Sequence, residues 1–389
     1  MTILAIETSC DETAVSILDC HGPTQFPKFK ALGNALYSQV KLHRKYGGVY
    51  PNLAKREHAK NLIPLLEEVL KEAKFFKPTK SSKKPTAKIE KILEREPELL
   101  KNLLKLVTKI EKPPIDAIAV TFGPGLEPTL WVGVNFAEAL GVIWNLPVIP
   151  VNHMEGHFVS VLYNSKLRTP VRYPAIALLI SGGHTQLVLS EKPLKYKIIG
   201  ETRDDAVGEA YDKVARMLSL PYPGGPQIYK LAQEMRSKRA ESKYLLPRPM
   251  LNSDNFDFSF SGLKTAVLYT LRKEKKITST IKKHIARAFE DAVTDVLIEK
   301  TRKAVEKFRP KSLIVAGGVI ANEEICRAFE SLAKKTGVKL YIPEKKLSTD
   351  NSIMIAMAGY IHIKNKPSLL RSPRNRKMRI MASGNAELH

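Results

Sequence analysis

The sequence predicts an α/β protein of two domains with a duplicated strand-turn-strand core. Its 389 residues suffice for two substantial hydrophobic cores. Two segments, 3–19 and 176–191, each have the pattern of a strand, a tight polar turn and a second strand. Strands alternate with amphipathic helices in the rest of the chain, as is typical of the α/β class. The same hairpin in both halves indicates that the fold is duplicated.

Polar turns follow three of the predicted buried strands. The first is the knot from Glu7 to Thr13, and the second is the Ser-Gly-Gly-His-Thr turn at 181–185. The third follows a strand at 312–316, where a Gly-Gly turn leads into a helix. That arrangement directs backbone N–H groups and a helix N-terminus toward an anion. A long helix is predicted at 281–308. Its apolar residues at helical spacing are Ile285, Phe289, Val293, Val296, Leu297 and Val305.

Residues 75–112 differ in composition from the segments around them. A Lys/Ser/Pro-rich stretch leads into one helix or a pair of helices, broken near Pro97. We interpret the segment as a helical, Lys-rich insertion on the first domain. We expect a solvated appendage with a small core of its own, in preference to a surface for RNA or a partner protein. The expected apolar stripe comprises Ile92, Leu93, Leu99, Leu100, Leu103, Leu104 and Val107.

The pattern predicts the following domain limits. The first domain spans 1–168 and is completed by a C-terminal helix at about 350–365, and the second domain spans 169–349. Residues 366–389 are expected to form a flexible, basic tail. The stretch 364–379 contains seven Lys or Arg residues and no acid, so it suits a phosphate backbone, although a tail without a specific role is equally compatible.

Composition narrows the class of partner and the compartment. The chain has 63 Lys and Arg against 39 Asp and Glu, a formal net charge of +24, which favours a nucleic-acid partner over a mere solubility effect. The apolar runs are too short to cross a membrane, and no leader pattern is visible. Cys10, Cys20 and Cys326 form neither a disulfide framework nor a Cys-rich zinc site. We therefore expect a cytoplasmic protein.

Two histidines in the stretch "PVNHMEGHFVS" are candidate metal ligands. On a helix, His153 and His157 point the same way, one turn apart. This is the spacing at which two imidazoles share one cation, but a pair of satisfied polar residues has the same spacing. A zinc peptidase of the H-E-x-x-H type needs its glutamate beside the first histidine, whereas Glu155 is two positions on and points elsewhere. A third ligand is available in Asp350, unless it serves as a helix cap.

In combination these segments resemble the universal family of tRNA N6-adenosine threonylcarbamoyltransferases, called TsaD in bacteria. The resemblance covers the chain except 75–112 and the basic tail, and its wording is closest to the bacterial branch. The motifs, in order, are "IETSCDET", "GGVYPNLAKREH", "HMEGH", "SGGHT", "DDAVGEAYDK", "YPGGP", "FSFSGLKTAV", "AGGVIAN" and "STDNSIMIA".

The resemblance implies a fold, a metal site and a nucleotide site. The fold is the two-domain actin/hexokinase/Hsp70-like (ASKHA) type. The family's metal ligands match His153, His157 and Asp350, which would hold one divalent ion per subunit, Fe²⁺ or Zn²⁺. The residues that match the family's nucleotide-binding positions are Ser181, Gly182, Gly183, His184, Thr185, Asp212, Gly225 and Asn322. They would hold threonylcarbamoyl-AMP in the interdomain cleft.

The resemblance also implies a reaction and partners. The threonylcarbamoyl group passes from threonylcarbamoyl-AMP to N6 of adenosine 37 in tRNAs that read codons beginning with A, and AMP is released. In bacteria the family works with a paralogue similar to TsaB and an ATPase similar to TsaE, and mitochondrial relatives are homodimers. The loop "GPGLEPTLWVG" departs from the pattern of the family. Pro128, Thr129 and Trp131 stand where the family has other residues, so the backbone conformation of this loop cannot be inferred from the resemblance.

Three other functions remain open at this point. A small-molecule kinase of the same fold would need a base such as Glu7 or Asp11, and it would leave the histidine pair unexplained. A metallopeptidase acting on sialoglycoproteins is disfavoured by the position of Glu155. A non-catalytic scaffold would not require a metal.

Overall fold

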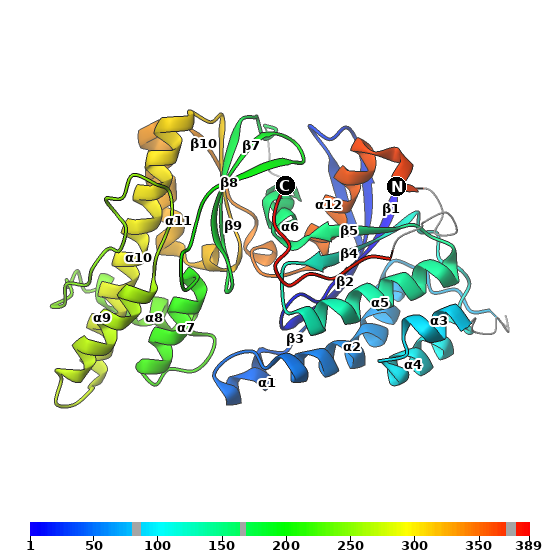
Figure 1. Ribbon diagram of the computed structural model, residues 1–389, viewed down its shortest axis with the longest axis horizontal. Coiled ribbons are helices and arrows are strands. Elements are labelled where there is room, and N and C mark those ends of the chain that lie inside the picture. The colour runs from blue at the N-terminus through cyan, green and yellow to red at the C-terminus, as the bar shows by residue number, and fades with distance from the viewer. Residues whose placement is uncertain (80–86, 164–168, 371–378) are drawn as a thin grey trace. The chain divides into compact units, whose positions relative to one another are not determined.

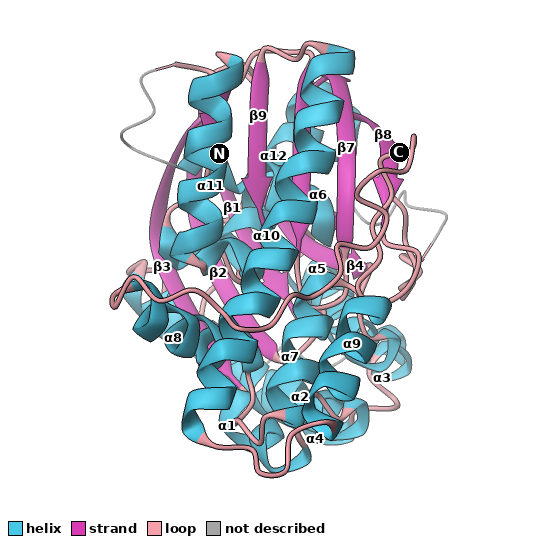
Figure 2. Cartoon of the chain, turned by 90° about the vertical axis from the view of Figure 1, so that its left-hand side faces the viewer, coloured by secondary structure: helices cyan, strands magenta, loops and turns pink. Residues whose placement is uncertain are grey.

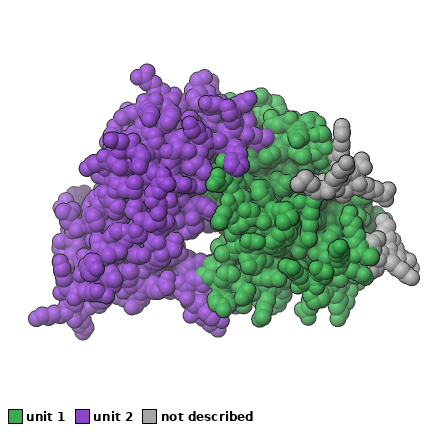
Figure 3. Space-filling model, viewed as in Figure 1, with its two compact units in different colours: residues 1–41, 49–170, 350–388 green, residues 42–48, 171–349, 389 purple. Residues whose placement is uncertain are grey.

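The computed structural model describes residues 1–79, 87–163, 169–370 and 379–389, which form two compact units (Figure 3). The first unit contains 1–41, 49–170 and 350–388, and the second contains 42–48, 171–349 and 389. Parts of the predicted insertion (80–86) and of the predicted tail (371–378) lie outside the described residues. Among the residues that are described, no helix combines the length and apolarity needed to span a bilayer.

The first unit is built around a five-stranded sheet with the order β3-β2-β1-β4-β5 (Figure 1). β1 and β2 are antiparallel, with Ile3 opposite Leu18, and the predicted polar turn joins them. β4 runs parallel to both β1 and β5. The strands are β1 (Thr2–Glu7), β2 (Glu12–His21), β3 (Lys28–Ser38), β4 (Ala117–Gly123) and β5 (Val148–Asn152).

The sheet of the second unit repeats this order as β8-β7-β6-β9-β10. β7 is antiparallel to its two neighbours, β6 and β8. β9 runs parallel to its two neighbours, β6 and β10. The duplicated core and the actin/hexokinase/Hsp70-like class predicted above are therefore confirmed. The strands are β6 (Ala175–Ile180), β7 (Thr185–Lys192), β8 (Lys195–Glu201), β9 (Ser312–Ala316) and β10 (Lys339–Tyr341).

Both faces of β1 are covered, because its run of Ile3, Leu4, Ala5 and Ile6 is wholly apolar and fully buried. Leu4 and Ile6 join a core with residues of α2 and α5. On α12, Gly359 lies so close to β4 that an added Cβ would be 2.8 Å from the Cβ of Ala119. The helices of this unit are α2 (Pro51–Glu72), α3 (Ala87–Ile92), α4 (Pro97–Val107), α5 (Glu127–Trp144), α6 (His153–Val159) and α12 (Ser352–Asn365).

The insertion forms a pair of helices, which was one of the two forms predicted from the sequence. The expectation that it has a small core of its own is wrong. α4 packs against α2, and α3 packs against α5. Leu93, Leu99 and Leu103 belong to the same buried cluster as Leu4 and Ile6 of β1. The apolar face of the pair is thus an outer layer of the main core, because two short helices bury more surface against long neighbours than against each other.

Helices of the second unit pack around its sheet in the same manner. The predicted long helix is α10 (Ser279–Phe308), and Ile285, Phe289 and Val293 are fully buried in its core. The other helices are α7 (Val207–Met217), α8 (Gly224–Arg236), α9 (Ser261–Arg272) and α11 (Glu323–Thr336). A single turn, α1 (Val40–His43), follows β3.

The last residues of the chain do not fit the expectation of a flexible tail. Ile380 and Ala382 are buried in the core of the first unit, and Ser383 N–H donates to Phe122 O at 2.9 Å. Arg379 contacts α5, where its guanidinium donates to Asn135 Oδ1 at 2.6 Å. The expectation was wrong because this segment contains apolar residues at 380, 382 and 388. Burial of their side chains favours an ordered segment, which a purely basic tail would not form.

Candidate metal centre

The histidine-bearing helix α6 begins directly at the end of β5, the edge strand next to β4. β5 ends at Asn152, and its side-chain oxygen accepts from the backbone N–H groups of Met154 (2.9 Å) and Glu155 (3.4 Å). Asparagine is a favoured N-cap residue, so this local sequence fixes where the helix starts. The cap places His153 at the first helical position and His157 one turn later.

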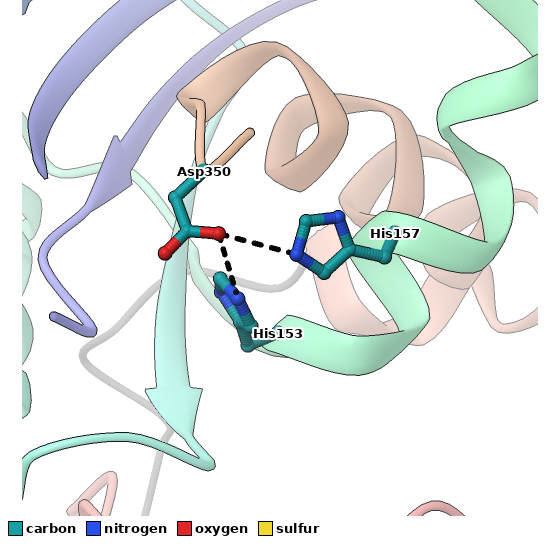
Figure 4. A group of neighbouring side chains, drawn as sticks. All are labelled: His153, His157 and Asp350. Carbon is teal, nitrogen blue, oxygen red and sulfur yellow. Dashed lines mark hydrogen bonds and ion pairs between the residues drawn. The ribbon is translucent and has the colours of Figure 1, made fainter. Parts of the chain in front are cut away.

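Both imidazoles point at one carboxylate oxygen (Figure 4). Asp350 Oδ1 lies 3.3 Å from Nε2 of His153 and 3.2 Å from Nε2 of His157. The two histidines are buried, and the Asp350 side chain retains 21 % of its exposure. The three residues predicted as metal ligands are therefore brought together, and all of them lie in the first unit.

Asp350 is free to face the histidines because its neighbour caps the helix. Asn351 is the N-cap residue of α12, and its side chain accepts from the N–H of Met354 at 3.0 Å. Sequence analysis had left open whether Asp350 itself serves as the cap. The structure assigns the capping role to Asn351 and leaves the carboxylate of Asp350 for the site.

The donor set suits a divalent ion. Two ligand atoms that each lie about 2.0–2.2 Å from a tetrahedral ion are roughly 3.3–3.6 Å apart, and the two Nε2–Oδ1 distances of 3.3 and 3.2 Å match this spacing closely. One potential ligand atom from each residue lies within 4.8 Å of the others. Two imidazoles and one carboxylate leave a coordination position open, as catalytic zinc and non-haem iron sites do.

A second carboxylate fixes the orientation of the first histidine. Glu7 Oε2 lies 3.1 Å from Nδ1 of His153, and Ser9 Oγ lies 3.2 Å from the same nitrogen. The hydroxyl of Thr121 and the N–H of Ser9 donate to the two oxygens of Glu7, at 2.5 and 2.6 Å. Because an ionised carboxylate only accepts, Nδ1 carries the proton toward Glu7 and Nε2 faces Asp350.

Sequence analysis missed this role of Glu7 and considered the residue only as a kinase base. A signal was present, since a glutamate at the end of an otherwise apolar, buried strand requires a partner. The partner, His153, cannot be identified from spacing alone. In the structure Glu7 is engaged by His153, Ser9 and Thr121, an arrangement that does not favour a role as kinase base.

The electrostatics of the cluster favour a cation. Burial lowers the pKa of His153, but the negative charges of Asp350 and Glu7 outweigh it and hold the pKa well above its ordinary value. Burial raises the pKa of Asp350, yet attraction to His153 and hydrogen bonds from both histidines bring it far below the usual range. The centre thus draws positive charge inward, as a proton or as an ion.

Glu155 has a different partner. Its Oε2 lies 2.6 Å from Nε2 of His362 on α12. Burial lowers the pKa of His362, but the hydrogen bond and attraction of Glu155 outweigh it, so that the pKa is raised. The carboxylate that a peptidase would need beside the metal is thus held by another histidine, which agrees with the helical geometry expected from the sequence.

The predicted nucleotide-binding turn joins β6 to β7 in the second unit. Ser181 N–H donates to His184 O at 2.9 Å, and Ser181 Oγ accepts from His184 N–H at 3.1 Å, which closes the turn. An added Cβ at Gly182 or Gly183 would meet nothing within 4 Å, so their backbone is accessible. Thr185 Oγ accepts from Val207 N–H at 2.9 Å and ties the turn to the start of α7.

The other predicted nucleotide-binding residues have structural partners. Asp212 Oδ1 accepts from Gly224 N–H at 2.6 Å, at the start of α8. The side chain of Asn322 caps α11 and donates to Glu290 Oε1 at 2.6 Å. Gly225, in the first turn of α8, has open space around its Cα. Asp212 and Asn322 therefore hold the starts of α8 and α11.

The third predicted turn lies beside the second, at 181–185, within the same unit. Parallel pairing places Leu179 of β6 opposite Ala316 of β9, so both strands end at one edge of the sheet. Gly317 follows β9 with φ +102°, and a Cβ there would be 2.4 Å from Ile180 O. Only glycine fits this approach. Two glycine-rich turns and the start of α7 thus gather at one sheet edge.

Loop 123–133 accommodates the residues that departed from the expected pattern. Pro128 lies in the first turn of α5, where proline's missing N–H costs nothing. Thr129 Oγ donates to Leu126 O at 2.7 Å and stabilises the same turn. Trp131 has the guanidinium of Arg379 5.2 Å from its ring centre. From Glu127 on, the segment is therefore a regular helix start.

Comparisons with known proteins identify the family to which this chain is similar. The family model for TsaD, tRNA N6-adenosine threonylcarbamoyltransferase, matches residues 30–80 and 83–357. Proteins of that name from Persephonella marina and Francisella tularensis subsp. novicida are each 42% identical to this chain. The first match covers 94% of this chain and 91% of the relative, and the second covers 92% and 93%.

A solved structure supports the fold alone. Full-length HypF, in its phosphate- and nucleotide-bound form, is similar with a TM-score of 0.52 at 12% identity. The similarity covers 94% of this chain and 46% of HypF.

Proposed function

This chain belongs to the tRNA N6-adenosine threonylcarbamoyltransferase family, and we propose that His153, His157 and Asp350 form the metal centre of its transfer reaction. The protein is a transferase that forms N6-threonylcarbamoyladenosine in tRNA. The observation that carries the proposal is the meeting of two Nε2 atoms at one oxygen of Asp350. The metal would be Fe²⁺ or Zn²⁺, because both accept two imidazoles and one carboxylate.

The chemistry requires an activated acyl donor, for which we propose threonylcarbamoyl-AMP. The exocyclic amine of adenosine is a weak nucleophile, because its lone pair is delocalised into the purine. In the transfer, a C–N bond forms between N6 and the carbamoyl carbon, the C–O bond to the phosphate breaks, the amine loses a proton, and AMP leaves. A bound divalent ion would supply Lewis-acid polarisation of a donor oxygen.

Protein groups would orient the site and hold the phosphate. Glu7 holds His153 through Nδ1, so that Nε2 stays directed at Asp350. In the second unit, Gly182, Gly183 and Gly318 carry no side chain and have open space around them, which suits the close approach of an adenylate phosphate to their backbone. We propose that the nucleotide is held there, with Asp212 and Asn322 supporting the helix starts around it.

The tRNA substrate explains the net charge of +24. One strongly basic surface is the turn between α9 and α10, where Arg272, Lys273, Lys275 and Lys276 are all exposed. The guanidinium of Arg272 lies 5.8 Å from the ring centre of Tyr269, which is 56% exposed. Exposed cations beside an exposed aromatic ring are suited to phosphates and unstacked bases. We propose that this surface, named here the α9–α10 turn, contacts tRNA.

The finer assignments rest on the family. We propose adenosine 37 of tRNAs that read codons beginning with A as the target, and the cytoplasm as the compartment. We also propose that the enzyme works with a paralogue similar to TsaB and an ATPase similar to TsaE, or as a homodimer. Size-exclusion chromatography of the protein alone and with candidate partners distinguishes these assemblies.

A direct experiment tests the proposal. Purified protein is incubated with threonylcarbamoyl-AMP and an unmodified tRNA, and the nucleosides are analysed by mass spectrometry. We expect the mass of threonylcarbamoyladenosine with the wild-type protein and its loss with His153→Ala. Modification by that variant at the wild-type rate would exclude the proposed metal centre.

A further inference from the structure

The end of the chain lies along the loop that follows β4. Residues 379–388, named here the C-terminal strap, hydrogen-bond to this loop twice. Ser383 N–H donates to Phe122 O at 2.9 Å, and Gly384 O accepts from Gly125 N–H at 3.1 Å. Phe122 is the last but one residue of β4, and Gly125 lies in the loop two residues before α5. The strap therefore holds the loop by its backbone.

Glycines make this close approach possible. At Gly123, with φ +156°, an added Cβ would lie 2.0 Å from Ser383 O and 2.8 Å from the Cβ of Ala386. At Gly384, a Cβ would lie 3.1 Å from Gly125 O. No larger residue at 123 fits while the strap is in place, so loop and strap are matched in shape.

The strap also holds the residue that starts the histidine-bearing helix. Asn152 Nδ2 donates to Glu387 O at 3.1 Å and to Ala386 O at 3.3 Å. The Oδ1 atom of the same side chain caps α6 through Met154 N–H, as described above. One amide thus joins the strap to the helix that begins with His153.

A second route leads from the strap to the same imidazole. Leu126, next to Gly125, donates its N–H to Ser9 O at 2.8 Å. Ser9 Oγ in turn lies 3.2 Å from Nδ1 of His153. An added Cβ at Gly125 would be 2.6 Å from Ser9 O, which shows how tightly this loop packs on Ser9. The strap thus contacts Asn152, which precedes His153 in the chain, and it holds the loop that contacts Ser9, which lies against the His153 ring.

The strap is anchored firmly enough to position other groups. Arg379 donates to Asn135 Oδ1 at 2.6 Å and lies 5.2 Å from the ring centre of Trp131, both on α5. Ile380 N–H donates to Glu138 Oε1 at 2.9 Å, and the Ile380 side chain is buried in the core of the unit. The match to the family model ends at residue 357, so the strap itself lies outside the matched region.

We propose that the C-terminal strap is a positioning element of the metal centre, which holds the His153 imidazole in place through Asn152 and through the Gly125–Ser9 contact. The strap touches none of the ligand atoms, so its effect passes through the helix start and the loop. The inference rests on the metal centre proposed above. It predicts that loosening the strap weakens metal binding while the fold is kept.

Two variants of the full-length protein test the inference. Asn152→Asp keeps an oxygen that caps α6 but removes the N–H groups that donate to the strap. Gly384→Val introduces side-chain atoms against the carbonyl of Gly125. Met381→Ser is the control, because the Met381 side chain is 63% exposed.

Metal-free protein is titrated with Co²⁺, and the visible absorption of the bound ion reports affinity and coordination. We expect Asn152→Asp and Gly384→Val to weaken Co²⁺ binding roughly tenfold or more, in the range found when outer partners of metal ligands are removed, and to alter the absorption bands. Amide hydrogen exchange of α6 in the metal-free variants should be faster than in the wild type. The control should match the wild type in both measurements.

The outcomes separate this inference from the proposed function. Wild-type Co²⁺ affinity and spectrum in both variants would overturn the role of the strap and leave the metal centre intact. Failure of the wild-type protein to bind Co²⁺ would overturn the metal centre and the inference together. If Gly384→Val does not fold, Asn152→Asp decides alone, since its cap is preserved.

Discussion

Nε2 of His157 lies 3.2 Å from Oδ1 of Asp350, although 193 residues separate them in the chain. The contact forms because α6 follows β5 and α12 packs on the same unit, so two helix starts meet. The remaining ring nitrogen of His157, Nδ1, is buried and has no hydrogen-bond partner among the described residues. Orientation of this imidazole therefore depends on Asp350 and on packing.

Replacement of His157 by alanine should remove a ligand and abolish stable metal binding. The expected loss exceeds the 10–100-fold change that is typical when an outer partner is removed, because a direct ligand is lost. Metal content after dialysis, measured by elemental analysis, checks this. The matched control is His284→Ala on α10, which should retain its metal. Equal metal content in both variants would contradict the assignment of the ligand.

Glu7→Gln should weaken metal binding about 10–100-fold, because an amide holds Nδ1 of His153 less strongly than a carboxylate does. Burial raises the pKa of Glu7, but attraction and hydrogen bonding to His153 outweigh it, so the group is ionised in the folded protein. Calorimetric titration with Zn²⁺ measures the change. The control, Glu155→Gln, alters a buried carboxylate bound to His362 and should leave the affinity near that of the wild type.

Removal of the metal should lower the thermal stability of the protein. A ligand that binds only the folded state adds about 2.7 kcal/mol at a free concentration one hundred times its Kd. Thermal unfolding followed by circular dichroism, with chelator and then with added Zn²⁺, should show a lower and then a restored Tm. In the His153→Ala variant the two curves should coincide, and a shift of equal size there would point to a different metal site.

Substitution of Lys273, Lys275 and Lys276 by glutamine should weaken tRNA binding and flatten its dependence on salt. If each lysine neutralises one phosphate, the slope of log K against log salt should fall by about 2–3. Binding is measured by fluorescence anisotropy at several salt concentrations. The comparison replaces Lys101 and Lys105 of α4, and Lys109 just beyond its end, by glutamine. An unchanged slope in the first variant would exclude the α9–α10 turn.

The Glu155–His362 pair should stabilise the protein most at low pH. The pKa of His362 is raised in the folded state, so the stabilisation is complete below the unfolded pKa of about 6.5 and is lost as pH rises through the folded value. His362→Gln should therefore cost about 1–2 kcal/mol at pH 6 and less at pH 9. Urea unfolding at both pH values measures this, with His21→Gln as an exposed control. An equal loss at both pH values would contradict the linkage.

Local patterns in the sequence were sufficient to predict the duplicated core. The apolar run from Ile3 to Ile6 and its counterpart from Ala175 to Ile180 are strands in the structure, and each is followed by the predicted polar turn. Such patterns are reliable because strand periodicity and turn chemistry depend on neighbours in the chain. The spacing of His153 and His157 was informative for the same reason.

Contacts between distant segments could not be predicted in this way. The pairing of Glu7 with His153 depends on where two strand ends meet in the folded unit. The choice of Asn351 as the cap of α12, which frees Asp350, depends on a backbone angle that the sequence "STDNS" leaves open. The strap was read as flexible because its charge outweighs a few apolar residues in composition, whereas Ile380 and Ala382 decide its packing.

The first unit is not contiguous in the chain, since 350–388 return to it after residues 171–349 of the second unit. During synthesis, the segment up to residue 170 leaves the ribosome without α12, Asp350 or the strap. The intervening 171–349 contains a complete sheet of its own and can fold first. Two of the three proposed ligands are therefore synthesised long before the third, and chains that stop before Asp350 should bind the ion only weakly.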